Sequence, residues 1–273
     1  MAQKEKSELS FLDHLEELRW HLIRSVVAIT IMMTAAFIFR EFIFDEIILA
    51  PKNPSFVTNA FFCRMAEKFG SPDLCINQKP MQLINITMSG QFNTHIRLSL
   101  VLGLILAFPY VFYQFWTFVA PALYPNERKA ARGTVFATAF LFILGVLFGY
   151  YILTPLSIHF LNTYVVSEQV LNQINLMSYI STVSMLTLAS GVVFELPILI
   201  FFLSKIGIVS PSFLRKYRRH AVIVILIIAA IITPPDVFSQ VLVFIPLMIL
   251  YEISIFISVA VYRKKEKKKE AEA

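Results

Sequence analysis

The chain has 273 residues, of which 57% are hydrophobic and only 15% are charged, and its formal net charge is +6. A water-soluble domain of this length does not carry so apolar a surface, so the composition excludes an ordinary globular protein and favours the lipid bilayer as solvent. A positive net charge is also typical of nucleic-acid-binding proteins, but the basic residues here form no continuous patch, and we expect no such partner.

The basic residues gather between apolar blocks, and the stretches 133–204 and 220–262 contain no lysine or arginine. Short loops rich in lysine and arginine stay on the cytoplasmic side of a membrane. We therefore predict that the four basic clusters face the cytoplasm. In chain order they lie within residues 4–24, 128–132, 205–219 and 263–269.

Apolar lengths and basic loops together predict an all-α polytopic membrane protein with six transmembrane helices and both termini in the cytoplasm. We expect residues 1–262 to form a single membrane domain and residues 263–273 a charged, disordered cytoplasmic tail. The predicted spans are 22–39, 98–120, 133–153, 179–204, 220–233 and 237–261, with external loops at 40–96 and 154–178.

The N-terminal segment 8–21 combines a Ser-x-x-Asp start with apolar residues at helical spacing, which predicts an amphipathic helix at the cytoplasmic surface. No apolar region with a small-residue cleavage site leads the chain, so we expect no cleavable signal peptide.

Three features of the spans are unusual. Residues 221–232 supply only 12 apolar positions, or about 18 Å of helix against a hydrocarbon core of about 30 Å. We therefore expect this fifth span to be extended by its flanks or to lie in a thinned bilayer. Pro197 predicts a kink in the fourth span, and Thr154-Pro155 predicts a break after the third.

Cys63 and Cys75 are the only cysteines, and the predicted topology places both in the first external loop. An oxidising compartment allows them to form a disulfide, while two free thiols in a surface loop remain the alternative.

Two carboxylates lie near the cytoplasmic rim. Glu17 is one turn from the entry of the first span, and Glu127 follows the second span in a turn restricted by Pro121 and Pro125. A carboxylate matches the planar fork of arginine in a bidentate way that lysine cannot copy, so the pair could clamp guanidinium groups. The alternative is that both are solvated, with Glu127 paired to neighbouring arginines.

Glu195 is the strongest single feature because a carboxyl group at mid-span costs on the order of 3 kcal/mol on insertion scales. Such a residue marks either function or a structural hydrogen bond to another helix. For Glu252, nearer the cytoplasmic third of the last span, we predict an interhelical polar contact.

The sequence contains no HExxH, GxSxG or phosphate-binding glycine loop, and its histidines are scattered, so we expect no enzyme activity, no cofactor and no metal site. A small-solute secondary transporter is the alternative function. Such carriers are built from related halves with paired broken helices, and we find no internal repeat.

Five sequence blocks together resemble the TatC family, the receptor and core subunit of the twin-arginine protein translocase. They run in family order from residue 14 to beyond residue 240. They are His14-Leu15-x-Glu17-Leu18-Arg19; Ala50-Pro51; Pro109 through Tyr113-Gln114, Trp116, Phe118 and Ala120-Pro121-Ala122-Leu123-Tyr124 to Glu127-Arg128; Gly191-x-x-Phe194-Glu195-x-Pro197; and Thr233-Pro234-Pro235-Asp236-Val237-Phe238-Ser239-Gln240.

The resemblance implies a glove-shaped, concave six-helix protein with short helices five and six in the bacterial cytoplasmic (inner) membrane. It would export folded proteins independently of Sec, bind twin-arginine signal peptides, recruit single-span TatA- and TatB-type subunits and other TatC copies within membrane lipid, and use the proton-motive force.

The same resemblance suggests roles for individual positions. The residues it implies for signal-peptide binding are Glu17, Arg19, Phe118 and Glu127; those for intramembrane or partner contact are Glu195, Pro197, Asp236 and Gln240; the structural ones are Pro51 and Pro121. The first external loop departs from the family pattern in its length and its cysteine pair.

Overall fold

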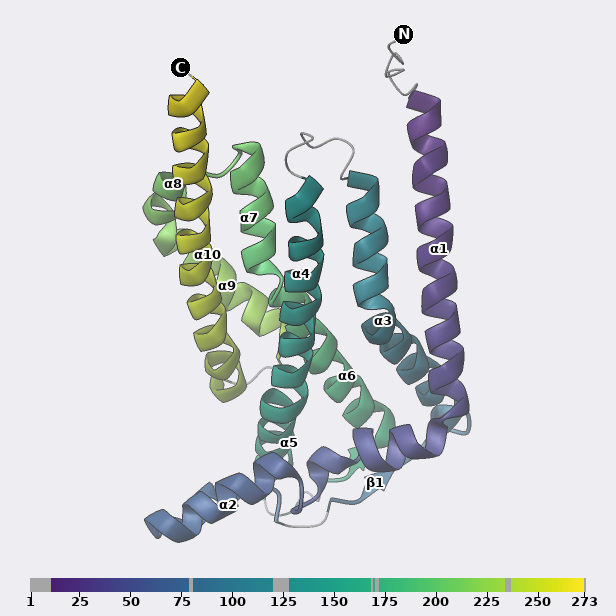
Figure 1. Cartoon of the computed structure of the whole chain (residues 1–273). Coiled ribbons are helices and arrows are strands. Elements are labelled where there is room, and N and C mark those ends of the chain that lie inside the picture. Colours follow the sequence, from purple (N-terminus) through teal and green to yellow (C-terminus); the bar gives the residue numbers. More distant parts are fainter. Residues whose placement is uncertain are drawn as a thin grey trace. The chain divides into compact units, whose positions relative to one another are not determined.

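The computed structural model describes residues 11–78, 81–119, 128–167, 169, 172–233 and 237–272. Nearly all of them are helical, and two short strands, β1 (Leu83–Ile84) and β2 (Ile174–Asn175), pair in parallel. The α-helices in Figure 1 are α1 (Phe11–Ile38), α2 (Val57–Phe69), α3 (Gly90–Val119), α4 (Arg128–Phe148), α5 (Thr154–Thr163), α6 (Leu176–Val193), α7 (Leu196–Ile206), α8 (Pro211–Lys216), α9 (Arg218–Ile232) and α10 (Val237–Glu272). Shorter π and 3-10 segments are η1 (Phe42–Ile48), η2 (Ala50–Lys52), η3 (Pro72–Leu74) and η6 (Gly149–Leu153).

Five helical stretches of the described residues are long and apolar enough to cross a bilayer. They are Leu15–Ile38, Gly90–Val119, Gly133–Thr163, Leu176–Ile206 and Ser239–Lys264. The molecule is therefore an all-α polytopic membrane protein, as the composition predicts.

The segment predicted as a fifth span forms α9, whose 15 residues give about 22 Å of helix. This length is less than the roughly 30 Å of a hydrocarbon core, and the six-span count stays a prediction.

The C-terminal segment corrects one expectation. The structure continues α10 as a helix to Glu272, so the prediction of a disordered tail is wrong. Lysine, glutamate and alanine are strong helix formers, and extending an existing helix avoids the cost of a new nucleus.

The described residues divide into two compact units. The first comprises those within Met1–Ile38 and Ser99–Ala139, and the second those within Phe39–Leu98 and Phe140–Ala273. In the first unit α1 crosses α3 closely at Gly103, where an added Cβ would lie 2.8 Å from the backbone of Met33. Small residues allow such close helix crossings in membranes.

In the second unit α6 packs against α4 and η6 through two glycines spaced one turn apart. A Cβ on Gly145 would lie 2.6 Å from the carbonyl oxygen of Ser190, and one on Gly149 would lie 2.7 Å from that of Leu186. Because backbone cannot yield as a flexible side chain can, this crossing requires glycine at both positions.

Replacing Gly149 with alanine should therefore destabilise the protein by about 1–3 kcal/mol, the usual range for overpacking a core. Thermal unfolding of the purified protein in detergent measures the change. Gly133→Ala is the matched control, because a Cβ there meets nothing within 4 Å and adds helix propensity. Equal midpoints for the two variants would contradict the close crossing.

Of the two predicted interruptions of the spans, the structure shows one, and at the other the helical path continues. The fourth span breaks between α6 and α7 at Phe194 and Glu195, with Pro197 in the first turn of α7, so the predicted kink is confirmed. At Thr154-Pro155 the helical path does not end. It changes to π geometry in η6 and restarts as α5, whose first turn tolerates Pro155 because an N–H there needs no helical partner.

The segment 42–78 of the second unit, hereafter the loop domain, is held by polar contacts to the helix ends. The hydroxyl of Tyr150 donates to the carbonyl of Ile47 at 2.6 Å, and that of Tyr179 donates to Ile48 at 2.9 Å. Cys63 and Cys75 form a disulfide, which resolves the alternative that the sequence left open.

Candidate functional site

In the first unit α1 and α3 are joined by a buried hydrogen bond one turn from Glu17. His21 Nδ1 donates to Gln114 Oε1 at 2.6 Å, and the His21 ring meets Phe118 edge-on with centroids 6.2 Å apart. Because Phe118 is one turn beyond Gln114, the bond sets the turn of α1 that carries Glu17 beside the turn of α3 that carries Phe118.

The side chains on this face differ in exposure. Glu17 and Phe118 are half-buried, whereas Arg19 is exposed. The structure therefore brings together two of the four residues predicted for signal-peptide contact. Glu127, like Pro121 of the same turn, lies outside the described residues.

Glu195 stands at the break between α6 and α7 in the second unit. The residue is half-buried, but both carboxylate oxygens are buried and have no hydrogen-bond partner among the residues that the structure describes. Pro197 beside it is also buried. A polar group left unsatisfied in an apolar surrounding costs free energy, so the Glu195 carboxyl does not stabilise the fold through a hydrogen bond to any described residue.

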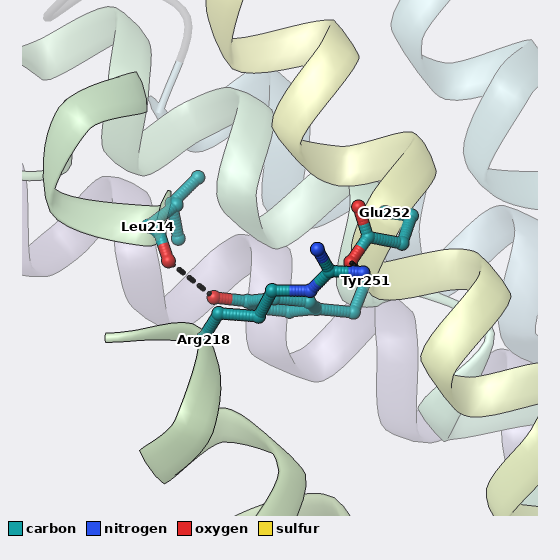
Figure 2. Close-up of polar contacts among 4 residues, drawn as sticks. All are labelled: Leu214, Arg218, Tyr251 and Glu252. Carbon is teal, nitrogen blue, oxygen red and sulfur yellow. Dashed lines mark hydrogen bonds and ion pairs between the residues drawn. The ribbon is translucent and has the colours of Figure 1, made fainter. Parts of the chain in front are cut away.

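The α9 and α10 helices are joined by a polar cluster, which Figure 2 shows. Arg218 Nη2 of α9 lies 2.7 Å from Glu252 Oε1 of α10, which confirms the interhelical contact predicted for Glu252. The neighbouring Tyr251 hydroxyl donates to the carbonyl of Leu214 in α8 at 2.9 Å. Together these contacts fix the start of α9 against α10.

Gln240, at the start of α10, also contacts α9. Its Nε2 donates to the carbonyl of Leu226 at 3.2 Å. Gln240, one of the residues predicted for partner contact, therefore also packs within the chain. Asp236 lies outside the described residues.

Pro51, predicted to be structural, is buried and hydrogen-bonded. It is buried in the first turn of η2, and its carbonyl accepts a 2.9 Å bond from Asn59 Nδ2. No cluster of three or more histidine, cysteine, aspartate or glutamate side chains placed to hold a metal occurs among the described residues.

Sequence reasoning did not single out three of the contacts above. They are the His21–Gln114 bond, the bond from Asn59 to Pro51, and Arg218 as the particular partner of Glu252. Periodicity places His21 on a helix but cannot pair it with a residue 93 positions away. A histidine one turn from Glu17 and an amide one turn before Phe118 were the available indications.

Comparison with known proteins places the chain in one family. The family model described as Sec-independent protein translocase protein (TatC) matches residues 13–246. TatC of Blattabacterium sp. subsp. Periplaneta americana is 43% identical over 265 residues, covering 96% of this chain and all of the relative. TatC of Desulforapulum autotrophicum is 37% identical over 270 residues, covering 99% and 91% of the two chains.

Solved structures agree. A crystal structure of the twin arginine translocase receptor TatC in DDM shares 35% identity and a TM-score of 0.72, covering 90% of this chain and 99% of that one. The family model, the sequence relatives and the solved structure all match this chain over nearly its full length. It is a member of the TatC family, a multi-pass membrane component of the Sec-independent, twin-arginine protein translocase rather than a catalytic enzyme.

Proposed function

We propose that this chain binds twin-arginine signal peptides of folded precursor proteins at its cytoplasmic face, with the arginines held by Glu17 and Glu127. The observation that carries the proposal is the His21–Gln114 bond, which sets half-buried Glu17 and Phe118 on adjacent turns of two helices. A partly desolvated carboxylate beside an aromatic ring suits a guanidinium group, which forms bidentate hydrogen bonds and stacks on aromatic faces.

The accompanying topology and assembly are part of the same proposal. The chain crosses the bacterial inner membrane six times with both ends in the cytoplasm, residues 1–262 forming one membrane domain and 263–273 a charged tail. It recruits single-span TatA- and TatB-type subunits and further TatC copies, with Glu195, Pro197, Asp236 and Gln240 toward partner or peptide. Transport is driven by the proton-motive force. The basic clusters support this arrangement, as does the Glu195 carboxyl, which has no hydrogen-bond partner among the described residues.

Site-specific crosslinking from a position near Glu127 tests the binding step. A twin-arginine signal peptide should crosslink strongly, and a twin-lysine version of it weakly. A charge-assisted hydrogen bond contributes about 1.5–3 kcal/mol, so Glu17→Ala should weaken peptide binding roughly tenfold to hundredfold.

Glu16→Ala is the matched control, since Glu16 is an exposed carboxylate adjacent to Glu17 on the same helix. It removes the same charge without removing the half-buried group. Equal crosslinking by both peptides, or equal effects of the two alanine variants, would refute the proposed site.

A further inference from the structure

The α2 helix of the loop domain has two unlike faces. One face packs inward through Asn59, which is fully buried, and Ala66, which is 5% exposed. The other face exposes large apolar side chains: Val57 is 69% exposed, Phe61 is 56% exposed and Phe69 is 63% exposed. A soluble surface helix normally presents polar residues outward, so these apolar side chains need a covering.

Basic side chains continue the line of Val57 and Phe61 toward the C-terminal end of α2. Val57, Phe61, Arg64 and Lys68 follow one another at intervals of four, three and four residues, which places them along one stripe of the helix. Arg64 and Lys68 are exposed. This placement suits a membrane interface, because long basic side chains carry their charges to the headgroups while their apolar stems stay beside the exposed apolar side chains.

The contacts of Phe56 and Thr58 with Tyr151 indicate the depth of α2 in the membrane. The hydroxyl of Thr58 donates to the carbonyl of Tyr151, and the Phe56 ring stacks on the Tyr151 ring with centroids 5.5 Å apart. The uncharged run that contains Tyr151 begins at Gly133, directly after the basic turn. Eighteen residues of helix at 1.5 Å each are about 27 Å, close to the roughly 30 Å thickness of the hydrocarbon core.

The start of α2 therefore lies where the acyl chains meet the headgroups on the side opposite the basic turn. The aromatic group formed by Phe56, Tyr150 and Tyr151 has the composition of the aromatic belt found at that level. Figure 1 shows α2 running crosswise to α10 and projecting sideways near α5, rather than continuing along the helix axes.

We propose that α2 is an interfacial anchor that lies in the outer headgroup layer, with Val57, Phe61 and Phe69 toward the acyl chains and Arg64 and Lys68 toward lipid phosphates. The partner is the phospholipid surface itself. The long side chains of arginine and lysine reach phosphate while their stems cover apolar surface. The disulfide at Cys63 holds the helix from its inner side, so that the apolar face stays turned outward.

Nitroxide accessibility in the full-length chain tests the anchor. Single variants Val57→Cys, Phe61→Cys and Glu67→Cys are spin-labelled, reconstituted into phospholipid vesicles and checked by mass spectrometry for an intact Cys63–Cys75 bond. Collision with oxygen, which concentrates in lipid, is compared with collision with a water-soluble nickel chelate. Labels at 57 and 61 should favour oxygen, and the label at 67, on an exposed polar position, should favour nickel.

Two other outcomes would overturn the anchor. Nickel access at 61 equal to that at 67 would mean that the face lies in water. Protection of 61 from both reagents would mean that protein covers it instead of lipid. The labels report only on α2, so the result is independent of whether the chain binds signal peptides.

Discussion

Replacing Glu195 with leucine is expected to stabilise the protein while lowering transport. Both carboxylate oxygens are buried without a partner among the described residues, in a candidate span where a carboxyl costs on the order of 3 kcal/mol. Leucine removes that cost and is itself favourable in an apolar surrounding, so the free energy of unfolding should rise by about 2–3 kcal/mol. Thermal unfolding in detergent and export of a twin-arginine precursor in cells measure the two effects.

A gain in stability together with a loss of transport would show that Glu195 serves function and not folding, because natural proteins retain destabilising groups chiefly where activity needs them. Glu195→Gln is the informative control. Its amide stays polar and unpartnered, so it should gain less stability than leucine does. A leucine variant less stable than the parent would show that the carboxyl has a structural partner, and unchanged export would remove Glu195 from the proposed mechanism.

Replacing Asn59 with leucine should strongly destabilise the loop domain. Asn59 is fully buried, its Nδ2 donates to the carbonyls of Pro51 and Asn53, and its Oδ1 accepts from Asn77 Nδ2 at 3.1 Å. Leucine has a similar volume but removes all three bonds. It leaves the buried Pro51 without this donor, whereas the Asn53 carbonyl still accepts from the Phe56 N–H and Asn77 Nδ2 still donates to Pro155. Each such loss costs about 1–3 kcal/mol, so the sum should reach about 3 kcal/mol or more.

Proteolysis of the loop domain under non-reducing conditions measures this effect locally. Asn93→Leu is a suitable control, because Asn93 is exposed and its side chain bonds only to Ser89 among the described residues. Faster cleavage is expected in the Asn59 variant alone. Equal rates for both variants would mean that the disulfide by itself holds the segment.

The same network includes an unusual backbone position. Asn77 has a φ of 53°, in the left-handed region that asparagine tolerates better than most residues. From there its Nδ2 also donates to the carbonyl of Pro155, and its backbone N–H donates to His159 at 3.2 Å. One asparagine thus joins the loop domain to α5.

Several local features could be predicted because their causes lie within a few residues. The α6–α7 break follows from Pro197, which cannot donate a helical hydrogen bond. The interhelical role of Glu252 follows from the cost of leaving its charge in a span.

Other features could not be predicted from local pattern. The helical path expected to break at Thr154-Pro155 continues through η6 into α5, because Pro155 lies in the first turn of α5, where its missing N–H needs no helical partner. Hydropathy predicts a second span that starts at residue 98, yet α3 begins at Gly90 because polar residues can extend a helix beyond its apolar part.

The sequence by itself determined that the chain is a membrane protein with helices of unequal length, and it predicts carboxylates at the cytoplasmic rim and at mid-span. Apolar length and charge position carry this information because the cost of transfer from water to lipid is set residue by residue.

Only the tertiary structure decided which residues meet. His21 and Gln114 are 93 positions apart and Asn77 and His159 are 82 apart, so no periodicity connects them. Hydrogen bonds form where packing brings donor and acceptor within about 3 Å, and that distance depends on how whole helices cross. The close approach at Gly145 and Gly149 and the outward apolar face of α2 have the same origin.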